Sequence, residues 1–443
     1  MGNIIAQRRQ KSKGHIGVQL RLFEHSLNAG LCLLFEVWRW WDGQNLLSGL
    51  LEKKGKPIPS LLLAYAARGP LGAFTQTRIA ETLEDDQLFE HYAGVSVKPY
   101  DLSRFLNDVR FPFEVFWKRA VAKLGTHKLT RCRPNGVLIV DDSALIKTGR
   151  KMAEVRKLFD HSKKQFARGI SYVQLYYLDR AKQYPLFFEL HSKRGRRPKA
   201  KPHRTAPIGK IRIALRLLDQ AIAAGIRPKA VLFDAWFLGT AFLKELHKLR
   251  LPFVSRLSSN RNLIVNGRTV KTKRLLKQKQ RYRYSRSLKA RWFALPAILP
   301  GYGPVLVVCL KHKRRKTAIV SNLLSADPCA LVELYRQRWA IETFFKEAKQ
   351  VFGLDKFQNR KRHGILAHLV LTNLSCLLVA LLKLLLPGAR SMKLKMLFRS
   401  LFRIVADLTF QNGTLIIIIG KTRRWFAKTV SFFNDLQPLA STA

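Results

Sequence analysis

The order of strand-like and helix-like segments between residues 136 and 255 constrains the fold of this chain most. Three segments rich in β-branched and aromatic residues come first, followed by a helical segment, a strand, a second helical segment and a last strand. The segments are Val137–Val140, Ile170–Leu178, Tyr184–Leu190, Ile208–Ala224, Ala230–Phe233, Leu238–Leu249 and Pro252–Ser255. The sequence therefore predicts an α/β core in this stretch.

This order of strands and helices is that of the RNase H-like fold. We predict such a core in two parts, residues 131–257 and residues 326–365, the second of which carries a strong helix. Between the two parts, residues 258–325 are basic and β-prone and contain a hairpin signal at Asn266-Gly267. We expect these residues to form a β-rich insertion in the core.

The net charge indicates a polyanionic partner. The 443 residues include 81 Lys and Arg but only 28 Asp and Glu, so the formal net charge is +53. Self-repulsion of that size disfavours a compact state unless a polyanion offsets it, and nucleic acid is the usual one. Anionic lipid is the alternative. The positive charge runs through the whole chain rather than flanking one segment, which favours nucleic acid.

The cysteines favour a reducing compartment. The chain has five, an odd number, and none of them stands in a C-x-x-C pair. This argues against zinc ribbons and disulfide frameworks. The start, Met1–Gln10, has no apolar core of the length that a signal peptide needs. We therefore predict a cytoplasmic protein.

Both flanking regions are predicted to be helical. In residues 1–130, apolar residues recur at helical spacing, for example at Leu102, Phe105 and Leu106, and we interpret this part as an N-terminal DNA-binding region. Residues 366–443 are expected to form a helical C-terminal region.

One apolar run, Gly364–Leu386, is long enough to span a bilayer. It contains His368, Asn373 and Lys383, which favour a buried helix and no membrane partner, while a membrane span is the alternative.

Acidic residues at strand ends stand out because acids are scarce. Asp141 and Asp234 end the first and fourth predicted strands, which are neighbours in this topology. Two carboxylates on adjacent strand tips, with a third from a nearby helix, can hold two divalent ions about 4 Å apart. Mg²⁺ and Mn²⁺ favour such oxygen ligands. Asp142 is a second candidate beside Asp141, and because side chains alternate along a strand, only one of the two can point inward.

The third carboxylate is expected on the helix after the β-rich segment, where Glu342 lies. At about 100° per residue, one narrow polar face of this helix carries Glu342 and four other side chains. The other four are Tyr335, Arg338, Lys346 and Lys349. A single carboxylate among cations suits a metal ligand beside a row of phosphates. The alternative is a solvated helix face with i,i+4 ion pairs.

The spacing on this helix resembles a known signature. Tyr335-x2-Arg338-x3-Glu342-x6-Lys349 is similar to the Y-R-E-K signature of DDE transposases of the insertion-sequence family 4 group. Asp141-Asp-Ser143 resembles the first motif of that family, Asp-x-Ser/Thr, and this spacing favours Asp141 over Asp142 as the ligand. Asp234–Phe237 resembles the second motif, and the stretch from Asp234 to Glu342 resembles the inserted β-domain of the family. The resemblance covers about 135–360.

The resemblance implies a divalent-metal-dependent, cut-and-paste DNA transposase of prokaryotes, which is associated with the nucleoid when bound to DNA. Asp141, Asp234 and Glu342 would bind two Mg²⁺ or Mn²⁺ ions and catalyse the reaction. Tyr335, Arg338 and Lys349 would contact phosphates of the transposon-end inverted repeats. Family members cut one strand by hydrolysis, form a hairpin end, reopen it and join it to target DNA, and we expect a homodimer with paired ends. A catalytically inactive DNA-binding protein derived from a transposase is the alternative.

Further DNA-binding candidates lie around these motifs. Lys147 and Arg150 follow the first motif, where phosphate contact and a surface loop are both open. Some family members place a base-stacking tryptophan in the strand before the signature helix, where this chain has Thr317. Trp236 and Trp292 are candidates for stacking on a flipped base instead. A place in the core is the alternative for both. The basic loop Lys193–Arg204 is a further candidate for phosphate contact, or a solvated linker.

Overall fold

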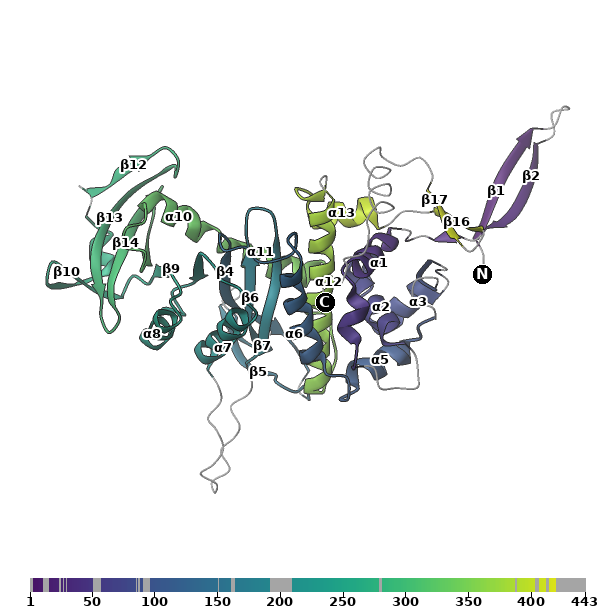
Figure 1. The fold of residues 1–443 in the computed structure, drawn as a ribbon, viewed down its shortest axis with the longest axis horizontal. Coiled ribbons are helices and arrows are strands. Elements are labelled where there is room, and N and C mark those ends of the chain that lie inside the picture. The colour runs from purple at the N-terminus through teal and green to yellow at the C-terminus, as the bar shows by residue number, and fades with distance from the viewer. Residues whose placement is uncertain are drawn as a thin grey trace, which may run out of the picture. The chain divides into compact units, whose positions relative to one another are not determined.

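In the computed structural model, the seven segments that the sequence predicts between residues 136 and 255 all form (Figure 1). The chain divides into two units, Thr130–Lys346 and the combination of Met1–Leu129 with Glu347–Ala443. The structure describes residues 3–10, 16–23, 25–26, 28, 30–50, 57–84, 86, 88–90, 96–149, 151–160, 164–191, 209–278, 281–386, 389–402, 406–411 and 414–419.

One mixed sheet of twelve strands runs through the described part of the unit Thr130–Lys346. Its strands are β4 (Val137–Ile146), β5 (Arg156–Asp160), β6 (Gln165–Leu178), β7 (Gln183–Leu190), β8 (Ala230–Phe233), β9 (Phe253–Leu257), β10 (Asn262–Val265), β11 (Arg268–Lys271), β12 (Arg283–Ser285), β13 (Ala290–Leu299), β14 (Gly303–His312) and β15 (Arg315–Ser321). They lie in the order β11-β10-β13-β14-β15-β9-β8-β4-β6-β5, with β12 beside β13 and β7 beside β6.

The directions of the strands confirm the predicted α/β character. β4 pairs antiparallel with β6, and β6 pairs antiparallel with β7. β4 pairs parallel with β8, and β8 pairs parallel with β9. The connections through this parallel part contain the helices α7 (Lys210–Ala223) and α8 (Thr240–Lys248), and Figure 1 shows α7 beside β6 and β7. Val137–Val140 is fully buried, as the uninterrupted apolar run of an inner strand requires.

The β-rich segment continues the core sheet instead of forming a separate one. β15 pairs antiparallel with β9, so the ladder passes from the parallel strands into β14, β13 and β10. The predicted hairpin is confirmed: β10 and β11 are joined by Asn266 and Gly267, whose φ angles of 49° and 75° are those of a two-residue primed turn.

The predicted helix after the β-rich segment divides into α10 (Pro328–Arg336) and α11 (Trp339–Gln350). Asp327 caps α10, because its side chain accepts a hydrogen bond from the N–H of Ala330 at 2.7 Å. Phe344 and Phe345 of α11 pack on tyrosines of β6, with centroid distances of 5.0 Å to Tyr176 and 5.9 Å to Tyr172. These contacts fix which face of α11 is turned towards the sheet.

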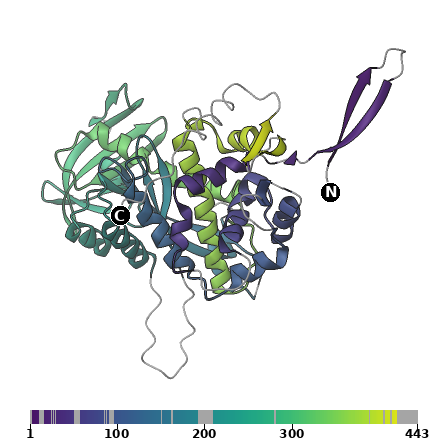
Figure 2. The same cartoon turned by 45° about the vertical axis from the view of Figure 1, so that its right-hand side comes forward.

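The other unit is centred on α12 (Arg362–Leu385), which packs against α1 (Leu31–Trp40), α2 (Ile58–Leu71), α5 (Pro99–Asn107) and α6 (Phe113–Lys123). Figure 2 shows α12 running between these helices. Among the described residues, α12 alone is long and apolar enough to cross a membrane, and 94% of its apolar window is buried inside the protein. The predicted buried helix is therefore confirmed. α3 (Gln76–Glu84) and α13 (Leu394–Leu401) belong to the same unit.

A buried arginine joins α2 to α12. The guanidinium of Arg68 donates to the hydroxyl of Tyr65 at 2.9 Å and lies 3.0 Å from Nδ1 of His368. It also donates to the hydroxyl of Thr372. These polar partners explain how an apolar helix accommodates His368, since buried polar groups are stable only when they are hydrogen-bonded.

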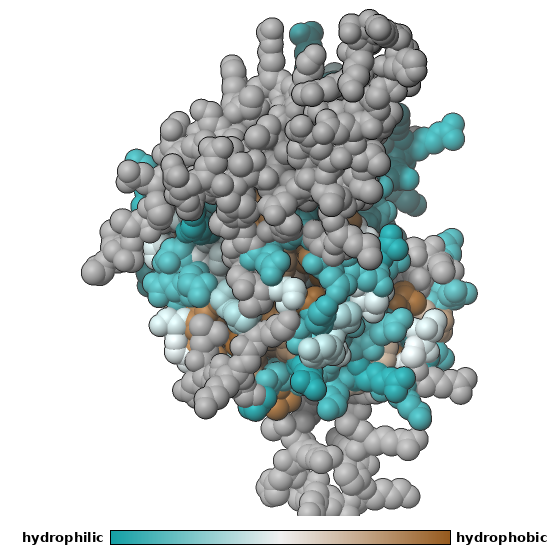
Figure 3. Space-filling model, turned by 90° about the vertical axis from the view of Figure 1, so that its right-hand side faces the viewer, coloured by the Kyte–Doolittle hydropathy of each residue, from teal (hydrophilic) through white to brown (hydrophobic). Residues whose placement is uncertain are grey.

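On the face drawn in Figure 3, the described surface is mainly hydrophilic, with small apolar areas between polar side chains.

The flanking regions contain strands that the sequence analysis did not predict. They are β1 (Asn3–Gln10), β2 (Ile16–Phe23), β3 (His25–Ser26), β16 (Ala406–Gln411) and β17 (Thr414–Ile419). The prediction of helical structure is wrong for these stretches. β2 alternates apolar and polar residues with a period of two, and β17 ends in four isoleucines, whose branched side chains favour strands over helices.

Candidate active site

The pairing of β4 with β8 places two of the predicted carboxylates opposite each other. The parallel register joins Val137 to Ala230 and Ile139 to Leu232. Continuing this register by two residues brings Asp234, which directly follows β8, opposite Asp141 of β4. Neighbouring strands are about 4.8 Å apart, and side chains at paired positions lie on the same face of the sheet. Asp141 and Asp234 therefore share one face at the carboxyl end of β8.

Arg338 joins Asp141 to Glu342. Its Nη1 donates to Oδ2 of Asp141 at 3.1 Å, and its Nη2 donates to Oε1 of Glu342 one helical turn further along. The side chains of Arg338 and Asp141 are only 14% and 16% exposed. One guanidinium thus holds a carboxylate from the sheet and a carboxylate from α11, and the charge of Asp234 also acts on Asp141.

The protonation of Asp141 is shifted by its surroundings. Burial raises the pKa of Asp141 to about 7. This pKa is the net result of several causes. Besides burial, the charges of Asp234 and Asp142 raise it, whereas Arg338 and the N–H of Asp142, which donates to Oδ1 at 2.9 Å, lower it. Burial also raises the pKa of the Tyr335 hydroxyl, against the effect of Arg338. In this site, a negative charge on these acidic groups is therefore costly unless a nearby cation compensates for it.

Asp142 points away from this group. Its Oδ2 accepts a hydrogen bond from Nζ of Lys210, on the first turn of α7, at 2.6 Å. Successive side chains in a strand face opposite sides of the sheet, so the two aspartates have different partners. Of the two candidates that the sequence left open, Asp141 is the one that lies with Arg338 and Glu342.

The donor set fits a hard divalent ion in its chemistry. Asp141, Asp234 and Glu342 offer carboxylate oxygens from two adjacent strands and one helix, and such oxygens are the ligands that Mg²⁺ and Mn²⁺ prefer. Within the described residues, however, no three Asp, Glu, His or Cys side chains are grouped closely enough to hold a metal ion as they stand. The Arg338 guanidinium now binds one oxygen of Asp141 and one of Glu342, so it competes with an ion for two of the three carboxylates.

Trp236 lies in the turn after β8 and is 54% exposed. The alternative of a core position is therefore wrong for this residue. The N–H of Trp236 donates to Oδ1 of Asp234 at 2.9 Å, and Nζ of Lys210 lies 5.2 Å from the centre of its ring. An exposed indole is thus held directly beside one of the candidate ligands.

The remaining candidates differ in how they are placed. Lys346 is exposed on α11, and Lys349 is partly buried two helical turns after Glu342. Lys147 follows β4 and is buried, so it is not a surface-loop residue, and little of its side chain is exposed for contact with a phosphate. Arg150 and the basic loop Lys193–Arg204 lie outside the described residues.

Two residues near the site were not singled out from the sequence. The sequence places Lys210 only within a predicted helix, whereas in the structure it contacts both Asp142 and Trp236. Trp339 begins α11 and is 64% exposed. A signal for Trp339 was present, because at about 40° from Tyr335 on a helical projection it is a large aromatic residue on an otherwise polar face.

Comparison with known proteins supports a nucleic-acid enzyme. Residues 191–378 match a family model described as the transposase DDE domain. This stretch contains Asp234 and Glu342 and begins after Asp141. No curated protein matches the chain. The family match supports a DDE transposase and, with it, a DNA-binding protein.

Proposed function

We propose that this protein is a cut-and-paste DNA transposase of the insertion-sequence family 4 group, with Asp141, Asp234 and Glu342 as its catalytic triad in an RNase H-like core. The observation that carries the proposal is that Arg338 binds both Asp141 of β4 and Glu342 of α11. Asp234 directly follows β8, two residues beyond the last paired position, at which Leu232 lies opposite Ile139 of β4. The strand order β7-β6-β4-β8-β9 supports this core, because it has three antiparallel strands followed by two parallel ones.

The proposed reaction is a series of in-line displacements at phosphorus. Water attacks the phosphodiester at the transposon end, the P–O bond to the 3′-oxygen breaks, and that oxygen leaves as a 3′-hydroxyl. The hydroxyl attacks a phosphodiester of the opposite strand, so that a hairpin closes and the 3′-oxygen of the flanking DNA leaves. Water reopens the hairpin at the new phosphodiester and frees the 3′-hydroxyl. This hydroxyl attacks a phosphodiester of the target DNA, whose own 3′-oxygen leaves. Two divalent ions bound by the triad would supply activation of the attacking oxygen and stabilisation of the leaving oxygen.

The cations beside the triad would position the DNA backbone. Arginine binds phosphate in the same two-pronged geometry as carboxylate, so a phosphate can replace Asp141 and Glu342 as the acceptor for Arg338. Tyr335, Lys346 and Lys349 would extend this contact along the transposon end. Trp236 would stack on a flipped base, with the Lys210 ammonium adding a cation–π contact.

Other parts of the proposal concern assembly and location. Cutting two ends and joining both to one target requires two active centres, which is why we infer a homodimer with paired ends. A net charge of +53 supports DNA as the partner. We further propose that the protein acts in the prokaryotic cytoplasm, bound to the nucleoid through DNA.

A catalytically inactive DNA-binding protein is the second candidate function. It is favoured by one observation, namely that Arg338 occupies the place between Asp141 and Glu342 and that no three potential ligands are grouped for a metal among the described residues. A protein of this kind would bind the transposon ends but would not cut them.

Glu342→Gln tests the proposed function. The substrate is a supercoiled plasmid that carries the inverted repeats flanking the gene, incubated with Mg²⁺ or Mn²⁺. We expect cleavage to fall at least about 100-fold, since several kcal/mol of transition-state stabilisation would be lost, while DNA binding stays within a few-fold of wild type. Glu245→Gln, on α8, makes the same chemical change at an ion pair with Lys248 and serves as the control.

Two outcomes would decide against parts of the proposal. Cleavage by Glu342→Gln at the wild-type rate would remove Glu342 from the mechanism. Binding of the plasmid by the wild-type protein without any cutting in either metal would favour the inactive DNA-binding protein.

A further inference from the structure

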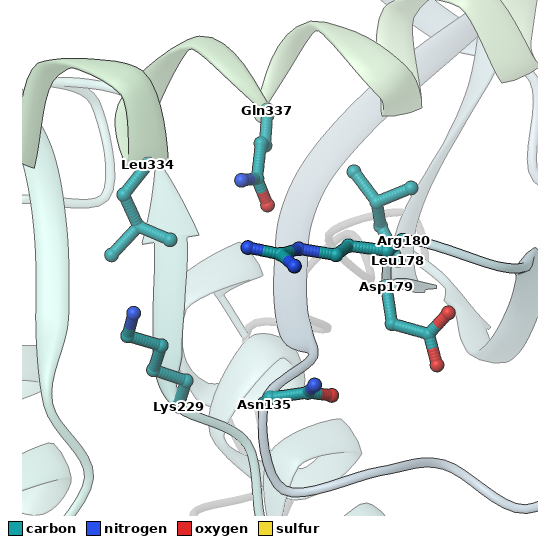
Figure 4. Close-up of a pocket in the computed structure, with 7 residues that line it drawn as sticks. All are labelled: Asn135, Leu178, Asp179, Arg180, Lys229, Leu334 and Gln337. Carbon is teal, nitrogen blue, oxygen red and sulfur yellow. The ribbon is translucent and has the colours of Figure 1, made fainter. Parts of the chain in front are cut away.

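A second concave site lies at the N-terminal ends of β4 and β8, within the unit Thr130–Lys346 (Figure 4). It has a volume of about 430 Å³. The lining residues come from the segments before β4 and β8, from the end of β6 and from α10 and its C-terminus, and they are Asn135, Leu178, Asp179, Arg180, Lys229, Leu334 and Gln337. None of these residues belongs to the triad or to its cations.

The single acid of this pocket is already neutralised. Asp179 accepts hydrogen bonds from Nζ of Lys182 at 2.7 Å and from the hydroxyl of Tyr177 at 2.7 Å. It also accepts from the N–H groups of Ala181 and Lys182, at 2.7 and 2.9 Å. The side chains of Asp179 and Lys182 are 2% and 1% exposed. This pair closes the wall of the pocket and contributes no net charge to it.

Arg180 and Lys229 leave the pocket with two uncompensated positive charges. Both residues are exposed, and neither forms an ion pair with any described residue. Figure 4 shows the Arg180 guanidinium, the Lys229 ammonium group and the Gln337 amide directed into the same space. Asn135 adds a second amide, while Leu178 and Leu334 provide apolar surface. This combination suits an anion that has an apolar part attached.

We infer that this pocket binds one phosphodiester group of the DNA backbone, with the adjoining deoxyribose against Leu178 and Leu334. The inference rests on the proposed function for the identity of the polyanion. Arg180 and Lys229 supply the charge, and the amides of Asn135 and Gln337 supply further N–H donors to phosphate oxygens. A contact of this kind reads no sequence but fixes the position of the duplex on the protein.

The distance between the pocket and the candidate active site follows approximately from the positions of their residues in the chain. Asn135 precedes Asp141 by six residues and Lys229 precedes Asp234 by five, and most of these residues belong to β4 and β8. For extended chain this corresponds to roughly 16–20 Å at about 3.3 Å per residue. DNA rises about 3.4 Å per base pair, so the bound phosphate would lie about five or six base pairs from the cleaved bond. The chain also links the two places directly, because Gln337 lines the pocket and the next residue, Arg338, binds Asp141.

The first test measures duplex binding by the full chain in EDTA, where no cleavage can occur. The probe is a labelled 30-base-pair duplex with one transposon end, and its affinity is measured by fluorescence anisotropy at several salt concentrations. Arg180→Gln combined with Lys229→Gln removes the pocket charges. We expect about tenfold weaker binding at low salt and a log–log salt slope reduced by about 1, the contribution of one phosphate contact. The control, Lys244→Gln with Lys248→Gln on α8, loses the same charge and is expected to keep the wild-type slope.

The second test reports on one residue. Lysines are acetylated with and without the duplex, and the products are measured by mass spectrometry. We expect the duplex to protect Lys229 at least fivefold and to leave Lys244 unprotected. Equal acetylation of Lys229 in both conditions, or equal slopes for the pocket and control variants, would overturn the inference. Protection by inorganic phosphate equal to that by the duplex, at the same phosphate concentration, would overturn the assignment to DNA.

Both tests are independent of the proposed chemistry, because they use no metal. A protein that fails to cut DNA can still protect Lys229, and a protein that cuts DNA can leave Lys229 unprotected. Failure of the pocket inference therefore leaves the result for Glu342→Gln unaffected.

Discussion

The substitution Asp141→Asn is expected to stabilise the folded protein at alkaline pH in the absence of metal. Burial raises the pKa of Asp141 to about 7, even with Arg338 beside it. A carboxyl whose pKa is higher in the folded than in the unfolded chain stabilises the fold only while it is protonated. This stabilisation is complete below about pH 4 and is lost as the pH rises towards 7. Asparagine keeps the shape of the side chain but never acquires the charge.

The magnitude follows from the size of the pKa change. A rise from the ordinary value of 3.8 to about 7 corresponds to about 4 kcal/mol of cost for the ionised form. The attraction of Arg338 is already contained in that pKa, and in the variant Arg338 keeps its bond to Glu342. We therefore expect Asp141→Asn to raise the free energy of unfolding by about 2–4 kcal/mol at pH 8. At pH 5 the gain should be smaller by about 2–3 kcal/mol.

The assay is urea denaturation followed by tryptophan fluorescence at pH 5 and pH 8, in EDTA. With a slope of about 3 kcal/mol per molar urea, the midpoint at pH 8 should rise by about 1 M. Asp219→Asn, on the exposed side of α7, makes the same chemical change away from the site and is the control. The reasoning is refuted if Asp141→Asn is no more stable than wild type at pH 8, or if its gain is the same at both pH values.

Two further predictions concern the cation at the site and the packing of the sheet. Without DNA, Arg338→Gln should bind Mn²⁺ at least about tenfold more tightly than wild type, because no guanidinium then competes for Asp141 and Glu342. Electron paramagnetic resonance of unbound Mn²⁺ measures this affinity. Unchanged or weaker Mn²⁺ binding would contradict the prediction. Gly169→Ala should cost about 1–3 kcal/mol and lower the melting temperature by about 5 °C, because the new Cβ would lie 2.6 Å from the carbonyl oxygen of Leu145. Gly125→Ala has open space around its Cβ and should leave the melting temperature within about 2 °C, so equal effects of the two alanines would show that the close approach is not what matters.

Local sequence determined most of the core elements of this protein. The apolar run of β4, the primed turn at Asn266-Gly267 and the start of α10 at Pro328 each depend on residues that are neighbours in the chain. Backbone preference and the period of apolar residues act over a few residues, so these elements were predictable. The strands β2 and β17 also have local signals, namely a period of two and a run of isoleucines, although the prediction for their regions was helical.

Tertiary structure decided the questions that depend on distant residues. That Asp141 rather than Asp142 lies with Arg338, a residue 197 positions away, follows from which face of β4 meets that guanidinium. Composition left two interpretations of α12, and its packing against four other helices decided in favour of burial. The pocket at Arg180 and Lys229 has no sequence signal, because its residues come from four separate segments. Sequence specifies what each segment can become, but charge balance and burial are properties of side chains brought together by the fold, and only the packed chain determines them.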